Sequence, residues 1–535
     1  TAGQIKVYGA VDPVSYAYTL SPALIGSDVL TGALIRAAGE TVGAYAITQG
    51  TLANANYDIT YVGSDFTITK KAITVTATAG QTKVYGAVDP ASYVYTLSPA
   101  LITGDVLTGA LTRAAGETVG AYAITQGTLA NTNYDITYVG SNFTITKKAK
   151  NTAFGLIGVG ALLAIVGIIS NIGEAHFVTR LMTNGLINAF FFFAIGLGAL
   201  FFLALNYATE AGWYAVVKRV IESVALYLPY GIGIFGVVLL TISFMKGAHI
   251  YTWMDSHTVA EDKLIQGKSA YLNLAFFWIR TLVYFAVYLL FLRGFRKRSL
   301  LEDQVGGTEI HFTNYRKGAT FLVFFAVFSS TSAWDWLMSI DVHWYSTLFG
   351  WYTFAGMWVS AMVVIVLTTI YLKKLGYLEN VNDSHIHDIG KWIFAISFLW
   401  SYLWFSQYML IWYANIGEEV VYYVMRTENY KYLYFGMFFI NFVFPMLILM
   451  SRDAKRDAGV LMFVGLVILI GHWLDVYIMV SGGSLGANWH IGMLEIGLPI
   501  MMAGIFILIL LRNLSKAPLT PVNHPFLDES IHHEF

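Results

Sequence analysis

Residues 188–207 read NAFFFFAIGLGALFFLALNY, twenty positions without a single charged side chain. A helix of about 20 apolar residues is long enough to cross the roughly 30 Å hydrocarbon core of a bilayer. The whole chain of 535 residues shares this character, because 56% of its residues are hydrophobic and only 12% are charged. An average soluble domain has about 25% charged residues. We therefore expect a membrane protein.

Apolar runs of similar length recur from residue 153 to residue 511, separated by short polar segments. They predict a mainly α, polytopic membrane domain with about ten transmembrane helices over residues 151–535. The predicted spans are 153–170, 184–206, 223–245, 270–292, 318–338, 348–371, 390–414, 431–450, 459–480 and 491–511.

The first 150 residues have a different pattern. Residues 4–71 and 81–148 repeat with a period of 77, and 60 of their 68 positions are identical. Apolar and polar residues alternate at 57–61 and 66–69, which is strand periodicity, and Gly, Pro and Asn mark the turns. We expect two all-β modules at 1–71 and 72–150 that act as a structural spacer. The repeats resemble the MBG-type β modules that occur in tandem in bacterial surface adhesins.

The repeat array looks incomplete at both ends. Its first copy lacks a full opening strand, and its second copy runs into the hydrophobic sequence after Lys150. The chain also begins at Thr1 without a methionine, so we expect a processed or partial product.

The residue counts exclude several chemistries. With no cysteine, the chain holds no disulfide, no thiolate-ligated zinc, no iron–sulfur cluster and no CxxCH haem attachment. A net charge of −1 without a basic tract argues against nucleic-acid binding. We assign no catalytic residue and no metal ligand. His524, His532 and His533 in the tail offer nitrogen ligands, but a disordered cytoplasmic end explains them better.

The distribution of Lys and Arg predicts the orientation. Sixteen of them fall in loops on one side of the predicted spans and six on the other. The positive-inside rule places the first set, and both ends of the ten-helix unit, in the cytoplasm of a bacterial cell, with the spans in its cytoplasmic (inner) membrane. An adhesin module belongs outside the cell, so we expect that the two halves do not share a natural history.

Ionisable residues inside predicted spans are costly and need a reason. Arg280 is expected in the middle of its span, with Asp335 or Asp475 as its acidic partner; a structural ion pair is the alternative. His472 and Asp475 are three residues apart and share a helix face, a pairing that can pass a proton. A hydrogen-bonded core histidine would look the same.

Two further groups of polar residues are candidates. Ser329 and Ser332 lead to Asp335 and suit a water wire, although serine also bonds helix carbonyls routinely. His and acidic residues gather on the non-cytoplasmic side, where they could relay protons or bind a quinone or a cationic or haem-bearing partner. Depletion of Lys and Arg there would give part of the same picture. The candidates for an interface or a quinone are His249, Asp255, Asp341 and His343, and Glu495 is a further candidate for the proton path.

The membrane half resembles the ActF subunit of bacterial alternative complex III, a quinol:electron-acceptor oxidoreductase, within the NrfD/PsrC-like family. The resemblance covers about 350 residues. Three stretches carry it: 188–229, AHIYTWMD at 248–255, and AWDWLMSIDVHWYSTLFGWY at 333–352. The last has the pattern DW-x-MS-[ILV]-[DE]-x-HW-[YF]-ST, which the sister subunit ActC shares, and is the most specific.

The resemblance implies two four-helix bundles with peripheral helices. It also implies a complex with ActA, ActB, ActC, ActD and ActE types of subunit, a lipid environment and a terminal oxidase as a further partner. Haem c and iron–sulfur clusters would lie on those subunits, and menaquinol at or near this one. In that family the quinol site is assigned to ActC, and the ActF-like subunit carries polar routes for protons. Arg280, Asp335, His472 and Asp475 become candidate proton-path residues.

Two other functions remain open. A secondary transporter or ion channel also places Arg, Asp and His inside the membrane. Against it, the spans lack obvious pairs of Gly- or Pro-broken helices in the two halves of the unit. A membrane-anchored adhesin would explain the repeats but not the intramembrane charges.

Overall fold

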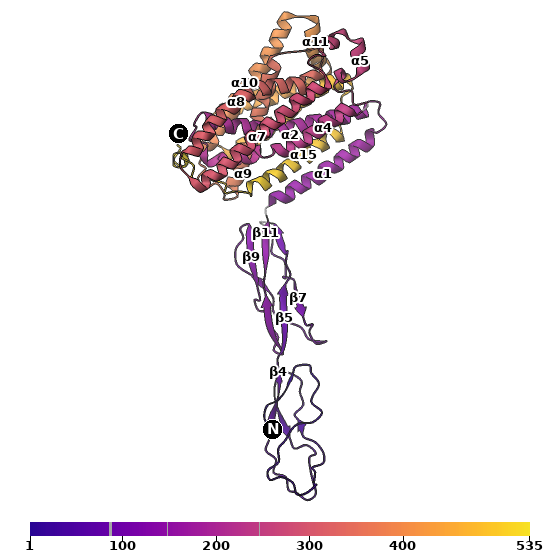
Figure 1. Ribbon diagram of the computed structural model, residues 1–535, viewed down its shortest axis with the longest axis vertical. Helices are drawn as coiled ribbons and strands as arrows, with labels where there is room; N and C mark the ends of the chain where they lie inside the picture. Colours follow the sequence, from indigo (N-terminus) through magenta and orange to yellow (C-terminus); the bar gives the residue numbers. More distant parts are fainter. Residues whose placement is uncertain (85–87, 147, 246, 535) are drawn as a thin grey trace. The chain divides into compact units, whose positions relative to one another are not determined.

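A computed structural model of the chain describes residues 1–84, 88–146, 148–245 and 247–534 (Figure 1). The chain divides into two compact units, Thr1–Lys148 and Ala149–Phe535. The first unit is built of β-strands and the second of helices, so the predicted class, β modules followed by a helical membrane domain, is confirmed.

Each β module has a four-stranded sheet. In both sheets the first strand of the repeat pairs in parallel with the last strand, and the other neighbours are antiparallel. The first sheet has the order β1 (Gln4–Val7), β4 (Ser64–Thr69), β3 (Gly43–Thr48) and β2 (Ile35–Arg36). The second has the order β6 (Thr82–Val84), β11 (Ser141–Thr146), β9 (Gly120–Thr125) and β8 (Thr112–Arg113).

The second module also has a three-stranded sheet, in which β5 (Lys71–Ala77) lies between β10 (Tyr134–Val139) and β7 (Tyr95–Ser98). The strand predicted at 57–61 is absent: residues 57–63, the counterpart of β10, form no regular structure. The sequences are almost the same, but β10 pairs in parallel with β5. Within the first module the structure describes no strand equivalent to β5. The backbone groups of residues 57–63 therefore have no partner strand among the described residues of this module.

The charged residues of the repeats are structural. Lys6 Nζ lies 2.5 Å from Asp12 Oδ1, and Arg36 Nε lies 2.7 Å from Asp12 Oδ2. The second module repeats this cluster with Lys83, Asp89 and Arg113. Hydrogen bonds from the arginine and the lysine hold the pKa of Asp89 well below its usual range. These ion pairs agree with a spacer role for the modules.

In the described residues of the helical unit, ten helical segments are long and apolar enough to cross a membrane, as predicted. They are α1 (Lys148–Asn171), α2 (Phe177–Ala208), α4 (Leu228–Phe244) with α3 (Lys218–Ala225) before it, α7 (Leu274–Val305), α8 (Glu309–Trp336), α9 (Leu348–Lys374), α10 (Asp383–Ala414), α12 (Lys431–Phe438) continued by α13 (Phe444–Leu449), α14 (Ala458–Ser484) and α15 (Met493–Leu514).

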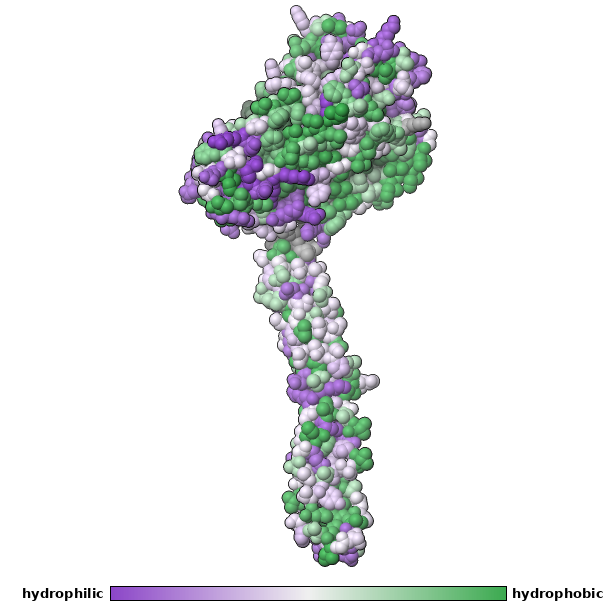
Figure 2. Space-filling model, viewed as in Figure 1, coloured by the Kyte–Doolittle hydropathy of each residue, from purple (hydrophilic) through white to green (hydrophobic). Residues whose placement is uncertain are grey.

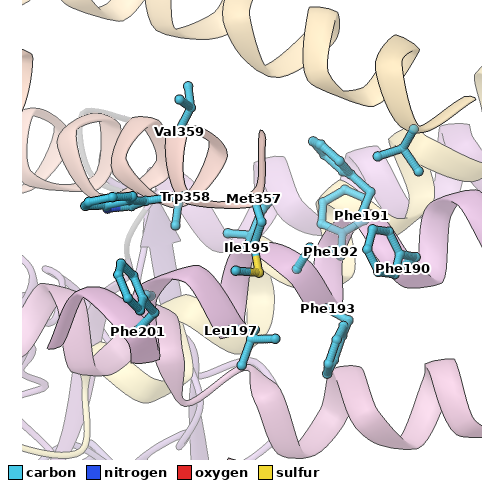
Figure 3. Packing of buried hydrophobic residues seen from close by; sticks show 14 of the residues in the cluster. Phe190, Phe191, Phe192, Phe193, Ile195, Leu197, Phe201, Met357, Trp358 and Val359 are labelled. Atoms are coloured by element: carbon cyan, nitrogen blue, oxygen red, sulfur yellow. The ribbon is translucent and has the colours of Figure 1, made fainter. Parts of the chain in front are cut away.

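Eight of these segments form two four-helix bundles, as expected. In bundle 1, α2 contacts α4 and α8, and α7 contacts the same two helices. In bundle 2, α9, α10, the segment of α12 and α13, and α14 close a second ring. Helices α2 and α9 pack together where the bundles meet, with Phe201 against Trp358 at 4.9 Å between ring centroids (Figure 3). The four consecutive phenylalanines of α2 are buried in this core, which is why an apolar sequence is required over this part of α2.

The remaining two helices, α1 and α15, pack closely on each other. A Cβ atom added to Gly160 of α1 would lie 2.3 Å from the backbone nitrogen of Met501 in α15. Gly497 of α15 is equally close to the backbone of Ala164. Glycine on both helices therefore lets their backbones touch.

Large hydrophobic side chains cover the outside of the helical unit. Val237, Ile279, Val323 and Phe463 are each more than half exposed, although all four lie in membrane-length helices. Figure 2 shows a broad hydrophobic area over these helices, with hydrophilic residues gathered towards its ends. Such a surface is stable in lipid and not in water.

Two expectations about the helical unit were wrong. Helix α7 continues through the basic segment after residue 292 to Val305, so Arg280 lies about two turns from its start and not at its middle. The tail is also packed against the helices. It includes the short helix α16 (Leu527–Ile531), and the Ser530 hydroxyl is buried and donates to the backbone carbonyl of Trp213 at 2.7 Å.

Candidate functional site: buried polar groups in the two bundles

Asp475 is a buried carboxylate in bundle 2 without a cationic partner among the residues that the structure describes. Trp400 Nε1 donates to its Oδ2 at 3.0 Å, and the Tyr352 hydroxyl donates to its Oδ1. Among the described residues, His472 is the basic side chain within 4.0 Å of the carboxylate, with its Nδ1 4.0 Å from Oδ2. Neither ring nitrogen of His472 has a hydrogen-bond partner. The predicted pairing of His472 and Asp475 on one helix face is present.

Three helices build this site. The spacing of three residues places His472 and Asp475 on the same face of α14. Tyr352 comes from α9 and Trp400 from α10. The edge of the Trp400 ring meets the His472 ring at a centroid distance of 5.3 Å, and Gly356 leaves room beside the imidazole. The site is thus part of the packed interior of bundle 2.

Asp475 lines two small cavities. Cavity A, about 20 Å³, is lined by His472, Asp475, Ser360 and Thr353 among others. Cavity B, about 10 Å³, is lined by Asp475, Tyr352, Gln407 and Arg426 among others. A polar cavity needs about 10–15 Å³ to hold one water. Asp475 therefore adjoins two spaces of the size of a single water molecule.

A third cavity extends the series into bundle 1. Cavity C, about 20 Å³, shares Phe190, Ala194, Thr353 and Met357 with cavity A. Its other lining residues include Ser329 and Ser332, two of the predicted proton-path residues. Neighbouring cavities share lining side chains, so A, B and C form a row, which we call the cavity row.

Cavity B ends at Arg426, in helix α11 (Gly417–Asn429). Arg426 Nη2 lies 3.0 Å from Asp341 Oδ2, and the guanidinium is 3.3 Å from the centroid of the Tyr422 ring. Burial acts to lower the pKa of Arg426, but Tyr422 and Asp341 outweigh it and raise the pKa, so the guanidinium stays charged. Asp341 is 24% exposed, which brings the row close to the surface.

Arg280 and Asp335 form a closed ion pair in bundle 1. Arg280 Nε and Nη2 each lie 2.8 Å from one oxygen of Asp335, and the Tyr284 hydroxyl donates to Asp335 at 3.0 Å. Of the two predicted partners, Arg280 has therefore taken Asp335 and not Asp475. Neither residue lines the cavity row as the structure describes it.

Glu495 is held in a second closed pair. Arg180 Nε and Nη2 lie 2.7 Å from its two oxygens, and Asn184 Nδ2 donates to Oε1 at 2.9 Å. Its Oε2 also accepts the backbone N–H of Gly492 at 2.8 Å, which caps the start of α15. With these bonds Glu495 joins α2 to α15, away from the residues that line the cavity row.

The other predicted residues lie in the loops between α4 and α7 and between α8 and α9. His343 Nε2 lies 2.6 Å from Asp262 Oδ2, and this hydrogen bond lowers the pKa of Asp262. Asp255 caps the short helix α5 (Ser256–Glu261), and the Thr258 hydroxyl lowers the pKa of Asp255. His249 is exposed. These side chains are not brought together in one site.

A larger cavity of about 680 Å³ lies among α1, α2, α9, α14 and α15. Its lining is almost entirely apolar and includes Phe191, Phe192, Trp473 and Pro499, with Glu495 as its carboxylate. The cavity has the chemistry of a site for a lipid chain or an isoprenoid tail.

Sequence reasoning missed three residues of the cavity row, Tyr352, Gln407 and Arg426. It also missed Trp400, which donates to Asp475. Gln407 could have been recognised from the sequence, because burying a polar amide within an apolar span is energetically unfavourable unless the amide is paired or functional. Arg426 lies between two predicted spans and was therefore counted among the loop residues. No pattern in the neighbouring sequence indicates that α11 packs against the helices and buries this side chain. Tyr352 and Trp400 resemble the many other aromatic residues of the spans.

Comparison with known families finds a match in the β modules. The MBG domain (YGX type) matches residues 1–67 and 73–144, and the Tyr-Gly-Ala of that type stands at 8–10 and 85–87. The two matches correspond to the two sequence repeats, so the resemblance predicted for this half is confirmed. No curated protein matches the chain.

Proposed function

We propose that the helical unit is an integral subunit of a respiratory quinol:electron-acceptor oxidoreductase of the alternative complex III type, and that it conducts protons past Asp475. The observation that carries the proton path is the buried Asp475 carboxylate, unpaired with a cation and adjoining two water-sized cavities. The motif at 333–352 supports the choice of complex. The unit would lie in the bacterial cytoplasmic membrane.

In this proposal, the residues of this chain transfer protons and not electrons. Quinol oxidation releases two protons and two electrons. The electrons would pass to iron–sulfur and c-haem groups on partner subunits, because the chain has no cysteine to hold them. Asp475 can accept a proton from a water in one cavity and return it to a water in the other, while Tyr352 and Trp400 keep the carboxylate in place.

The apolar cavity fits a supporting role. Its volume and lining suit the isoprenoid tail of menaquinol or a lipid chain, with Phe191, Phe192 and Trp473 in contact. It lacks the several convergent polar groups that would orient a quinol headgroup. A headgroup site at the contact with a sister subunit agrees better with this lining.

One test purifies the full chain from its native membranes in mild detergent and records the visible spectrum of what accompanies it. A c-haem spectrum that quinol reduces would support the assignment. A colourless preparation of this chain alone would contradict it.

A transporter or channel is the second candidate, favoured by one feature. The span at Lys431–Leu449 is interrupted by a π-helical turn at Phe439–Val443, and π-helical turns often occur at functional sites. Asn441 in this turn is buried with both side-chain amide atoms unpaired, against Gly471 of α14. Transport of a solute by reconstituted chain in vesicles would favour this candidate.

A further inference from the structure

Three ionisable side chains meet in a buried cluster outside the cavity row. Glu302 comes from the end of α7, His311 from the start of α8, and His524 from the tail. They are 0%, 3% and 4% exposed, and one ligand atom from each lies within 4.8 Å of the others. Segments far apart in the chain thus deliver two imidazoles and a carboxylate to one point.

Four polar atoms of this cluster have no hydrogen-bond partner among the described residues. They are Glu302 Oε1, His524 Nε2 and both ring nitrogens of His311. A buried polar group without a hydrogen-bond partner destabilises the fold. Other buried side chains of this protein also have unpaired atoms, but here four such atoms belong to three side chains that meet at one point, and this requires an explanation.

The surroundings hold the cluster in position. Lys218 Nζ donates to Glu302 Oε2 at 2.6 Å, which fixes the carboxylate and leaves Oε1 available. Asp303 holds the tail, because its Oδ1 accepts the backbone N–H of Val522 at 3.1 Å and its carbonyl accepts the side chain of Asn523 at 2.8 Å. His524 follows immediately. The tail is therefore anchored at the position that brings its histidine to the cluster.

The nearby cations are already neutralised. Lys218 is paired with Glu302, and Arg219 is paired with Glu222 and Asp303. Glu210 adds a negative charge beside the cluster, because its Oε1 lies 3.6 Å from His311 Nε2. A positive ligand would therefore gain more attraction than repulsion here.

We propose that Glu302, His311 and His524 bind one divalent transition-metal cation of the zinc type, with Glu210 within reach as a fourth ligand. Two imidazoles and one or two carboxylates form a donor set that such cations accept in tetrahedral geometry. The backbone N–H of Phe526 donates to His524 Nδ1 at 3.2 Å, so without a metal this ring carries its proton on Nε2, where it has no acceptor. When a metal binds Nε2, the ring proton moves to Nδ1, and His524 loses the hydrogen bond from the backbone N–H of Phe526.

The metal would join the tail to the connection between α7 and α8. A trypsin site tests this link, because Lys516 is the last Lys or Arg of the chain and cleavage there releases residues 517–535. The metal-bound protein should resist that cleavage, and the metal-free protein should lose its tail faster.

The experiment uses the full chain purified in detergent, stripped with a chelator and titrated with Co²⁺ or Zn²⁺. We expect one metal per chain by elemental analysis, visible Co²⁺ bands of tetrahedral ligation, and slower tryptic cleavage at Lys516. His311→Ala and His524→Ala should weaken binding by more than the 10- to 100-fold that is typical for loss of an outer-shell partner. The matched control is His532→Ala, an exposed histidine of the same tail that should bind as the parent does.

Two results would overturn the proposal. One is a parent chain that binds no stoichiometric metal and whose tail is cleaved at the same rate with and without zinc. The other is metal binding that survives in both histidine variants. The first result needs no variant, so a folding defect in His311→Ala or His524→Ala does not protect the proposal.

Discussion

Asp335 in bundle 1 and Asp475 in bundle 2 are both fully buried carboxylates, but their surroundings differ in charge. Asp335 receives two hydrogen bonds from Arg280, so its negative charge is compensated within the fold. Asp475 receives hydrogen bonds only from the neutral Tyr352 and Trp400 and adjoins two water-sized cavities. Burial therefore does not distinguish the two carboxylates. In the function proposed above, the lack of a fixed counter-charge and the room for water make Asp475 the candidate proton carrier.

The largest effect, a loss of stability, is expected when the ion pair of Arg280 and Asp335 is broken. Arg280→Ala leaves the Asp335 carboxylate buried without its cation, and loss of one partner of a buried ion pair typically costs about 3–5 kcal/mol. Thermal unfolding in detergent should show a large loss of stability. The double variant Arg280→Ala with Asp335→Asn should recover part of it; a single variant as stable as the parent would mean that the pair is not structural.

Asp475→Asn tests the uncompensated carboxylate. The amide keeps the size and accepts hydrogen bonds but cannot carry the proton, so proton-coupled turnover should fall about 100-fold, the lower range for loss of an acid–base group. Stability should change little, because no cation loses its partner. Quinol-driven proton release from the reconstituted complex measures the effect. Unchanged proton release per electron would remove Asp475 from the path.

Tyr352→Phe should have an intermediate effect. It removes the hydroxyl that donates to Asp475 Oδ1 and keeps the ring, so we expect a loss of about 1 kcal/mol in stability, the usual value of one hydrogen bond. Proton release should slow less than in Asp475→Asn. Tyr284→Phe, which removes the hydroxyl beside Asp335, is the matched control and should leave proton release unchanged.

The smallest effect is expected at the far end of the cavity row. Ser332→Ala enlarges cavity C slightly and removes a long hydrogen bond of 3.4 Å to the Ser329 carbonyl. If water in the cavity conducts, proton release should change less than about twofold. Ser332→Leu fills the cavity and should slow release more. Equal rates in both variants would exclude cavity C from the path.

The sequence predicts local features of this protein well. The ten spans follow from apolar length alone, and the pairing of His472 with Asp475 follows from helical spacing. It left the partner of Arg280 open, because that choice depends on which helices pack together. It missed the burial of Arg426 and the docking of the tail for the same reason. The strand predicted at 57–61 failed because a strand also needs a neighbour.

β5 has a consequence for how such an array can grow. This strand lies at the junction of the two sequence repeats, yet it completes the second sheet of the module that follows it. A duplication of one 77-residue period copies the strand together with the segment that will pair with it. If whole 77-residue periods are gained or lost, each junction between modules therefore keeps its β5 strand, wherever within the period the gene is cut.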